Sequence, residues 1–242
     1  MDKNFLDIDY DSSWEDFLTD DVKNFISIAE GKYDDKTSSP GRCDVLRFMK
    51  QNLLEVKYVL YGQDPYPRNN GKMVATGRCF EPEGYTDWMI KTPNTSLRNI
   101  LRAIYGYYYN DNNPSISKIR KQISNNSFNI PTPPLFFDNL EKQGLLLLNY
   151  GLTILKNPGD QLDLWDDFQK RLLMYLYKTN PDIVYIIWGN KVYDLIIGLQ
   201  ERINKENNIN MKLKLIQDCH PARNGFVTNN NTFKNTPDIK WG

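Results

Sequence analysis

The sequence has little of several features that define whole classes of protein. It has three cysteines, one histidine and no excess of either charge, since 30 basic residues balance 30 acidic ones. Three scattered cysteines are too few for a disulfide framework or an iron–sulfur cluster. One histidine leaves no zinc site that His and Cys spacing could build. We therefore expect a protein that works without a bound metal or cofactor.

The balanced charge and the short apolar runs limit which partners and which cellular compartment are expected. No run approaches the roughly 20 apolar residues that span a bilayer, so no membrane partner is expected. Residues 1–5 lack the basic and then apolar layout of a signal peptide, which predicts an intracellular protein of the nucleus or cytoplasm. A zero net charge gives no general attraction to a polyanion. Any contact with nucleic acid must come from a local patch or from backbone donors.

Apolar stretches with strand-like length alternate with helical patterns along the 242 residues. The predicted strands are 56–61, 145–148, 183–188 and 213–216. Four strands separated by helices predict right-handed crossovers and an α/β fold around a central four-stranded, mainly parallel sheet. The last strand alternates apolar and polar residues, which predicts a partly exposed sheet edge. No internal repeat or domain boundary is visible, so residues 1–242 are expected to form one domain.

Two segments outside the strands carry further expectations. Residues 43–54 continue a helical spacing of apolar side chains. Residues 110–134 are rich in Asn, Ser and Pro and contain little apolar material. This composition predicts a long surface loop or a partly disordered insertion.

Residues that could serve a binding or catalytic site follow each of the four predicted strands. Gly62 ends the first strand and leads into a stiff turn with Asp64, and Asn149, Gly189 and His220 follow the other three. The carboxyl ends of parallel strands share one edge of a sheet, so one cleft could collect all four positions. Because loops are polar in any protein, placement alone leaves chance and a common active site as even alternatives.

Six short motifs occur in a fixed order over roughly residues 40–242. They are Gly62-Gln63-Asp64-Pro65-Tyr66, Ala75-x-Gly77-x-Cys79-Phe80, Ser96-Leu97-Arg98-Asn99-Ile100, Gln143-Gly144-Leu145 to Asn149, Ile187-Trp188-Gly189 and His220-Pro221, with Ile239-Lys240-Trp241 after them. In order and spacing the chain resembles the family 1 uracil-DNA glycosylases. The resemblance implies a three-layer α/β/α architecture and an enzyme that flips uracil out of DNA and hydrolyses its N-glycosidic bond.

The resemblance also implies catalytic and base-binding roles. Asp64 would stabilise the oxocarbenium-like sugar and position water, and His220 would donate a hydrogen bond to the uracil oxygen that gains charge. Three further residues would form the pocket for the base. Asn149 would read uracil, Phe80 would stack on it and Tyr66 would exclude the thymine methyl group.

Contacts to DNA follow from the same resemblance. Backbone amides of Gln63 would help bind the base, while Ser96, Gly189 and the turn after His220 would hold phosphates. Arg223 in that turn would stack or bind a phosphate, with a solvated surface arginine as an equal alternative. Uracil-containing DNA is the expected partner, and proteinaceous inhibitors of uracil glycosylases are a further expected class.

Three positions depart from the usual family pattern. Pro67 stands where the family has a histidine, the loop after Pro221 is short and has no leucine wedge, and Gly159-Asp160 replaces a Ser-His pair. The first two departures resemble the poxvirus-type branch, whose glycosylase also serves a viral polymerase in the host cytoplasm. The alternative function is therefore a non-enzymatic DNA-binding or polymerase processivity subunit on the same fold.

Overall fold

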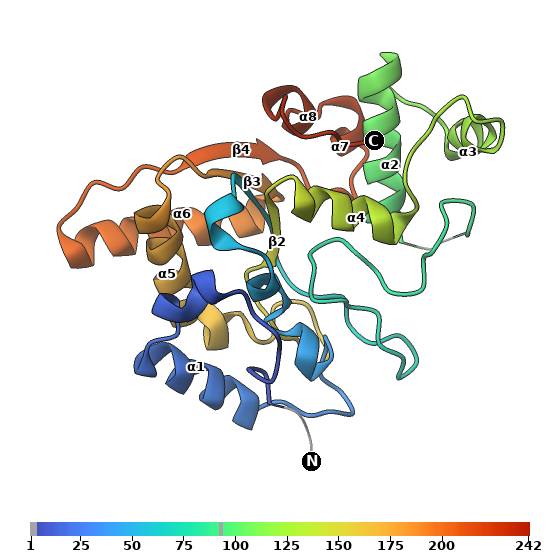
Figure 1. Cartoon of the computed structure of the whole chain (residues 1–242). Coiled ribbons are helices and arrows are strands. Elements are labelled where there is room, and N and C mark those ends of the chain that lie inside the picture. Colours follow the sequence, from blue (N-terminus) through green and yellow to red (C-terminus); the bar gives the residue numbers. More distant parts are fainter. Residues whose placement is uncertain (1–3, 92–93) are drawn as a thin grey trace.

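Four parallel strands form the centre of the structure, with helices on both faces of the sheet (Figure 1). The computed structural model describes residues 4–91 and 94–242. Residues 1–5 were expected not to form a signal peptide, and Met1 to Lys3 of that stretch lie outside the described residues. The strands are β1 (Tyr58–Gly62), β2 (Leu145–Asn149), β3 (Val184–Trp188) and β4 (Lys214–Asp218). Their order across the sheet is β2-β1-β3-β4, and each neighbouring pair is parallel. The predicted four-stranded α/β fold is confirmed.

Side chains alternate between two hydrophobic cores because successive residues of a strand point to opposite faces. In β1, Val59 and Tyr61 enter the first core, while Tyr58 and Leu60 enter the second. The strands β2 and β3 divide their side chains in the same way. Both faces of the inner sheet are therefore buried, which explains why these strands read as nearly continuous apolar runs.

Helices supply the outer layers of both cores. The α-helices are α1 (Asp20–Gly31), α2 (Thr95–Tyr109), α3 (Ile116–Ser124), α4 (Pro133–Lys142), α5 (Leu162–Thr179), α6 (Asn190–Asn207), α7 (Gly225–Thr228) and α8 (Thr232–Asn235). The first core holds the apolar faces of α1, α5 and α6, and the second holds those of α2, α3, α4, α7 and α8. This arrangement confirms the three-layer α/β/α architecture.

Two local predictions were wrong. Residues 43–54 form the 3₁₀ helices η2 (Arg42–Asp44), η3 (Arg47–Lys50) and η4 (Leu53–Glu55), after η1 (Ser12–Phe17), and no continuous α-helix. The expected loop at 110–134 contains α3, which begins where the Ser115 hydroxyl accepts the backbone N–H of Lys118. Ile119 anchors α3 in the second core, and Phe128 and Ile130 hold the chain after the helix in the same core, so a few buried side chains order a segment with a polar composition.

The two edge strands differ in how they are covered. All five residues of β2 are buried, whereas β4 is partly exposed along most of its length, as its alternating sequence predicted. Within the described ranges, each helix is too short or too polar to cross a lipid bilayer.

Candidate active site

The carboxyl ends of the four strands meet at one edge of the sheet, as the sequence predicted. Gly62 pairs with Asn149 across β1 and β2, and Trp188 pairs with Asp218 across β3 and β4. The backbone N–H of Gly189 donates to the Asp218 carbonyl oxygen at 2.9 Å. These pairings bring the residues that follow the strands onto a common edge.

Asn149 places a buried side-chain amide oxygen at this edge of the sheet. Its side chain is 3% exposed, and its Oδ1 atom has no hydrogen-bond partner among the described residues. A Cβ atom at Gly62 would lie 2.4 Å from that Oδ1 and 2.9 Å from the Cβ of Cys79. Glycine at position 62 is therefore required for the amide to sit against β1. Because buried polar groups in proteins are nearly always paired, this oxygen is suited to a ligand.

Asp64 lies in the turn directly after β1 and is enclosed by two other loops. The Gln63 side-chain amide donates to its Oδ2, and the backbone N–H of Gly159 also donates to the carboxylate. A Cβ atom at Gly151 would lie 2.9 Å from its Oδ1. Burial raises the pKa of Asp64, while the bond from Gln63 and the charge of Lys191 oppose that rise.

Phe80 and Tyr66 form an aromatic wall of the site. The Phe80 ring packs on Trp188 at 5.0 Å and on His220 at 5.9 Å between ring centroids. The Tyr66 hydroxyl donates to the Phe80 carbonyl oxygen at 3.5 Å and hydrogen-bonds the side chain of Ser96. Burial raises the pKa of Tyr66 to about 12, so the phenol stays neutral. Ser96 is buried at the start of α2, and its role in holding a phosphate stays a prediction.

His220 is exposed at the end of β4 and has a defined tautomer in its neutral form. The backbone N–H of Ala222 donates to its Nδ1 at 3.1 Å, which leaves the ring proton on Nε2. Burial of part of the ring and the charge of Arg223 lower the pKa of His220. Gly189 packs beneath the ring at a φ of 132°, a conformation that residues with a Cβ atom rarely adopt. Neutral His220 can therefore donate a hydrogen bond from Nε2.

An open cleft of about 400 Å³ joins several of these residues. Gln63, Gly189, His220 and Arg223 line it, together with Lys191 from the first turn of α6. Sequence reasoning missed Lys191, although a lysine directly after the glycine turn of the third strand was a usable signal. A cleft with a carboxylate nearby, a neutral imidazole and two cations can bind an anionic ligand and stabilise charge on it.

Comparison with known proteins connects this geometry to a family. No protein-family model matches the sequence. A Mesomycoplasma hyopneumoniae protein named uracil-DNA glycosylase is 30% identical over 78% of this chain and 70% of its own length. The chain belongs to the uracil-DNA glycosylase family. A further relative with that name, from Clostridium perfringens, is 27% identical over 88% of this chain and 83% of its own length.

A solved family structure supports the fold assignment. The wild-type UNG of Nitratifractor salsuginis superposes with a TM-score of 0.71 at 20% identity, covering 95% of this chain and 91% of that one. These relatives are bacterial, so membership of the poxvirus-type branch is not confirmed.

The departure at Gly159-Asp160 has a structural explanation in this member of the family. The Asp160 carboxylate accepts the backbone N–H groups of Leu155, Lys156 and Asn157 at 2.8–3.1 Å. Burial opposes the shift, but these three bonds hold the pKa of Asp160 below its usual value. Asp160 therefore stabilises its own loop. Gly159 lets Lys191 approach this loop closely, because a Cβ atom at position 159 would lie 3.0 Å from the lysine Nζ.

Proposed function

We infer that this chain is a uracil-DNA glycosylase, a hydrolase that cleaves the N-glycosidic bond between uracil and deoxyribose and so begins base excision repair. Relatives with that name support the activity. The single observation of the site that carries it is the buried Oδ1 of Asn149, which lacks a partner among the described residues and lies against Gly62 beside the Asp64 turn.

Recognition of the base uses the buried part of the site. The Asn149 amide offers a donor and an acceptor to the Watson–Crick edge of an extruded uracil. Phe80 stacks on the base, and backbone amides at Gln63 bind its oxygen. Tyr66 occupies the position where thymine carries its methyl group. Its hydroxyl donates to the Phe80 carbonyl oxygen and accepts a bond from the Ser96 side chain, and these bonds keep it there.

Bond cleavage uses Asp64 and His220. As the glycosidic bond breaks, its electron pair leaves with uracil, and the sugar becomes cationic. The ionised carboxylate of Asp64 stabilises that cation and orients the water that attacks it, while the Nε2–H of His220 donates to the uracil oxygen that gains charge. Groups fixed in place before charge develops are the largest catalytic contribution in many enzymes. The proton released by the water finally neutralises the uracil anion.

Binding of the DNA backbone uses the exposed part of the site. Gly189 and Arg223 line the open cleft and are the contacts we assign to phosphates there, and the buried Ser96 at the start of α2 is a third. Lys191 adds a cation in the same cleft. This small local set lets a chain with zero net charge hold DNA.

A uracil-excision assay tests the function. A labelled double-stranded oligonucleotide with one uracil is incubated with the chain and then heated in alkali, which cleaves the strand at abasic sites. We expect cleavage that requires uracil and disappears in Asp64→Asn. An equal yield from a thymine-containing oligonucleotide, or no cleavage by the wild-type chain, would contradict the assignment.

A second function on the same fold is a DNA-binding subunit of a polymerase complex. The observation that favours it is the short loop after Pro221, which ends in α7 and has no leucine wedge. We expect such a subunit to retain DNA binding and to co-purify with a polymerase accessory protein when Asp64 is replaced. Failure of the Asp64→Asn chain to bind either would exclude this function.

Protein inhibitors are a further proposed class of partner. A mimivirus UNG variant (Y322L) solved in complex with UGI superposes with a TM-score of 0.60 at 21% identity, covering 91% of this chain and 73% of that one. We propose that an inhibitor of this kind blocks the same edge of the sheet here. We also propose that the chain acts inside the cell, because its substrate is DNA.

A further inference from the structure

Phe80 has a backbone conformation that its neighbours must maintain. Its φ of 63° lies in the left-handed region, which residues with bulky side chains rarely adopt. Such conformations persist only where the surrounding structure determines them. We call residues 75–82 the Phe80 loop. What fixes this loop also fixes the ring that faces the base.

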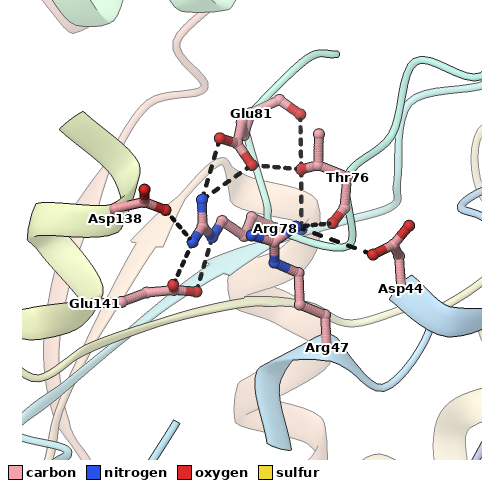
Figure 2. A network of polar contacts seen from close by, with 7 residues as sticks. All are labelled: Asp44, Arg47, Thr76, Arg78, Glu81, Asp138 and Glu141. Carbon is pink, nitrogen blue, oxygen red and sulfur yellow. Dashed lines mark hydrogen bonds and ion pairs between the residues drawn. The ribbon is translucent and has the colours of Figure 1, made fainter. Parts of the chain in front are cut away.

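Arg78, two residues before Phe80, is the centre of a buried ionic network (Figure 2). Its side chain is 6% exposed. The guanidinium donates from Nε and Nη2 to Glu141, from Nη2 to Asp138 at 2.6 Å and from Nη1 to Glu81 at 3.2 Å. One cation thus serves three carboxylates, two of which belong to α4.

The residue after Phe80 is held by the same network. Glu81 is buried, accepts from Arg78 and also accepts the Thr76 hydroxyl at 2.6 Å. Burial raises the pKa of Glu81, and the charge of Arg78 opposes that rise. The loop is therefore fastened on both sides of Phe80, and Cys79 adds a contact from its Sγ to the Leu60 carbonyl oxygen.

The network also joins the two parts of the predicted base pocket. Glu141 lies in the last turn of α4, which leads through Gly144 into β2 and so to Asn149. The backbone N–H groups of Lys57 and Tyr58 donate to the Gly144 carbonyl oxygen and fix this connection to β1. Arg78 therefore links the loop that carries the stacking ring to the helix that precedes the reading strand.

We propose that Arg78 is a positioning residue for base binding: its bonds to Glu81, Asp138 and Glu141 hold Phe80 where it stacks on uracil. This inference rests on the proposed function. The planar fork of arginine serves several carboxylates at once, which the single ammonium of a lysine cannot do. Removing the cation leaves three carboxylates that repel one another, so the loop and α4 separate and the ring moves.

The test compares uracil inhibition constants, measured from excision rates with free uracil present. An unfolded fraction lowers the maximal rate but leaves this constant unchanged, so it reports the pocket of the folded molecules alone. The variants are Arg78→Met, Arg78→Lys and Glu141→Gln. The control is Lys170→Met, which removes a cation paired with Asp167 and Glu206 on the first-core side of the molecule.

Base stacking accounts for a large share of single-base affinity, so we expect Arg78→Met to raise the uracil inhibition constant about tenfold. We expect the uracil inhibition constant to rise about threefold for Arg78→Lys and for Glu141→Gln, because each keeps part of the ionic network. We expect no change for Lys170→Met, which leaves the Arg78 guanidinium and its partners intact. Constants within twofold of wild type in the Arg78 and Glu141 variants would overturn the inference, whatever happens to stability. If Arg78→Met yields no folded protein, Glu141→Gln and Arg78→Lys decide the outcome. A wild-type chain that does not excise uracil would instead overturn the proposed function.

Discussion

The two halves of the carboxyl edge enclose their functional groups to different degrees. The β1–β2 half presents Asp64 and Asn149, and Asn149 is 3% exposed. The β3–β4 half presents His220 and Arg223, both of which are exposed. Although β2 and β4 are both edge strands, four leucines bury β2 on both faces, while lysine and glutamine keep β4 open to solvent. The enclosed half is thus suited to reading a base where water is excluded, and the open half is suited to holding a DNA backbone.

Asp64→Asn in the enclosed half is expected to have the largest effect. We predict that kcat falls by about 10³- to 10⁴-fold because the cationic sugar loses its charged partner. Since burial raises the pKa of Asp64, its ionised form destabilises the folded state at neutral pH, and this cost disappears as pH falls through the raised pKa. The variant should therefore have a higher Tm than wild type at pH 7 and a similar Tm at acid pH. Single-turnover excision and thermal melting measure the two effects, and a lower Tm at pH 7 would contradict this account.

Asn149→Ala tests whether the enclosed half reads the base. Its loss leaves two polar groups of uracil unpaired in a buried pocket, at about 1–3 kcal/mol each, so we predict a fall of about 10²- to 10³-fold in kcat/KM. Gly62→Ala should cause a similar loss without changing the amide, because the new methyl group would occupy the position 2.4 Å from Oδ1. Steady-state kinetics on a uracil oligonucleotide check both variants. Full activity in Gly62→Ala would show that the amide does not need its place against β1.

His220→Gln tests the contribution of the exposed half of the edge to catalysis. We predict a fall of about 10²-fold in kcat, the usual cost of one donor aimed at developing charge. We expect a smaller fall in kcat than for Asp64→Asn because solvent near the imidazole weakens the electrostatic interactions that His220 makes. The measurement is single-turnover excision at saturating enzyme. An effect larger than that of Asp64→Asn would reverse the ranking of the two halves.

The pH dependence of excision should report both halves. The pKa of Asp64 is raised and that of His220 is lowered, so both groups change charge at acid pH. Below the raised pKa of Asp64 the carboxylate is neutral, and we predict that kcat falls by about tenfold per pH unit. Protonation of His220 removes the Nδ1 acceptor of the Ala222 N–H, which should add a second acid limb that His220→Gln abolishes. A profile that is flat below pH 5 would contradict this assignment.

Arg223→Ala is expected to have the smallest effect. A phosphate contact at an exposed position contributes little specificity, so we predict a three- to fivefold weaker Kd for DNA and a salt slope smaller by about 1. Lys191→Ala, in the same cleft, is the matched comparison. Fluorescence anisotropy over a salt series measures both, and an unchanged slope would mark Arg223 as a solvated surface residue.

Much of the fold and of the candidate site could be predicted from the order of residues in the sequence. Nearly continuous apolar stretches separated by helical patterns predicted the sheet, because strands buried on both faces need continuous apolar sequence. The positions of Asp64, Asn149, Gly189 and His220 after those strands predicted a shared edge, because parallel strands end together. The motif order further identified Phe80 and Tyr66, whose aromatic types alone fit an ordinary core.

Tertiary structure decided the rest because it depends on contacts between distant segments. The helix α3 forms within a polar segment because Ile119 finds a core built by other elements. Only the packing of the loops around Asp64 shows that Asp160 stabilises its loop and that Lys191 lies beside Gly159. The sequence assigned no role to the arginine two residues before Phe80, and only the folded structure shows three carboxylates around it. Sequence thus predicted which groups carry the chemistry, and packing decided which of them are buried, hydrogen-bonded and fixed in place.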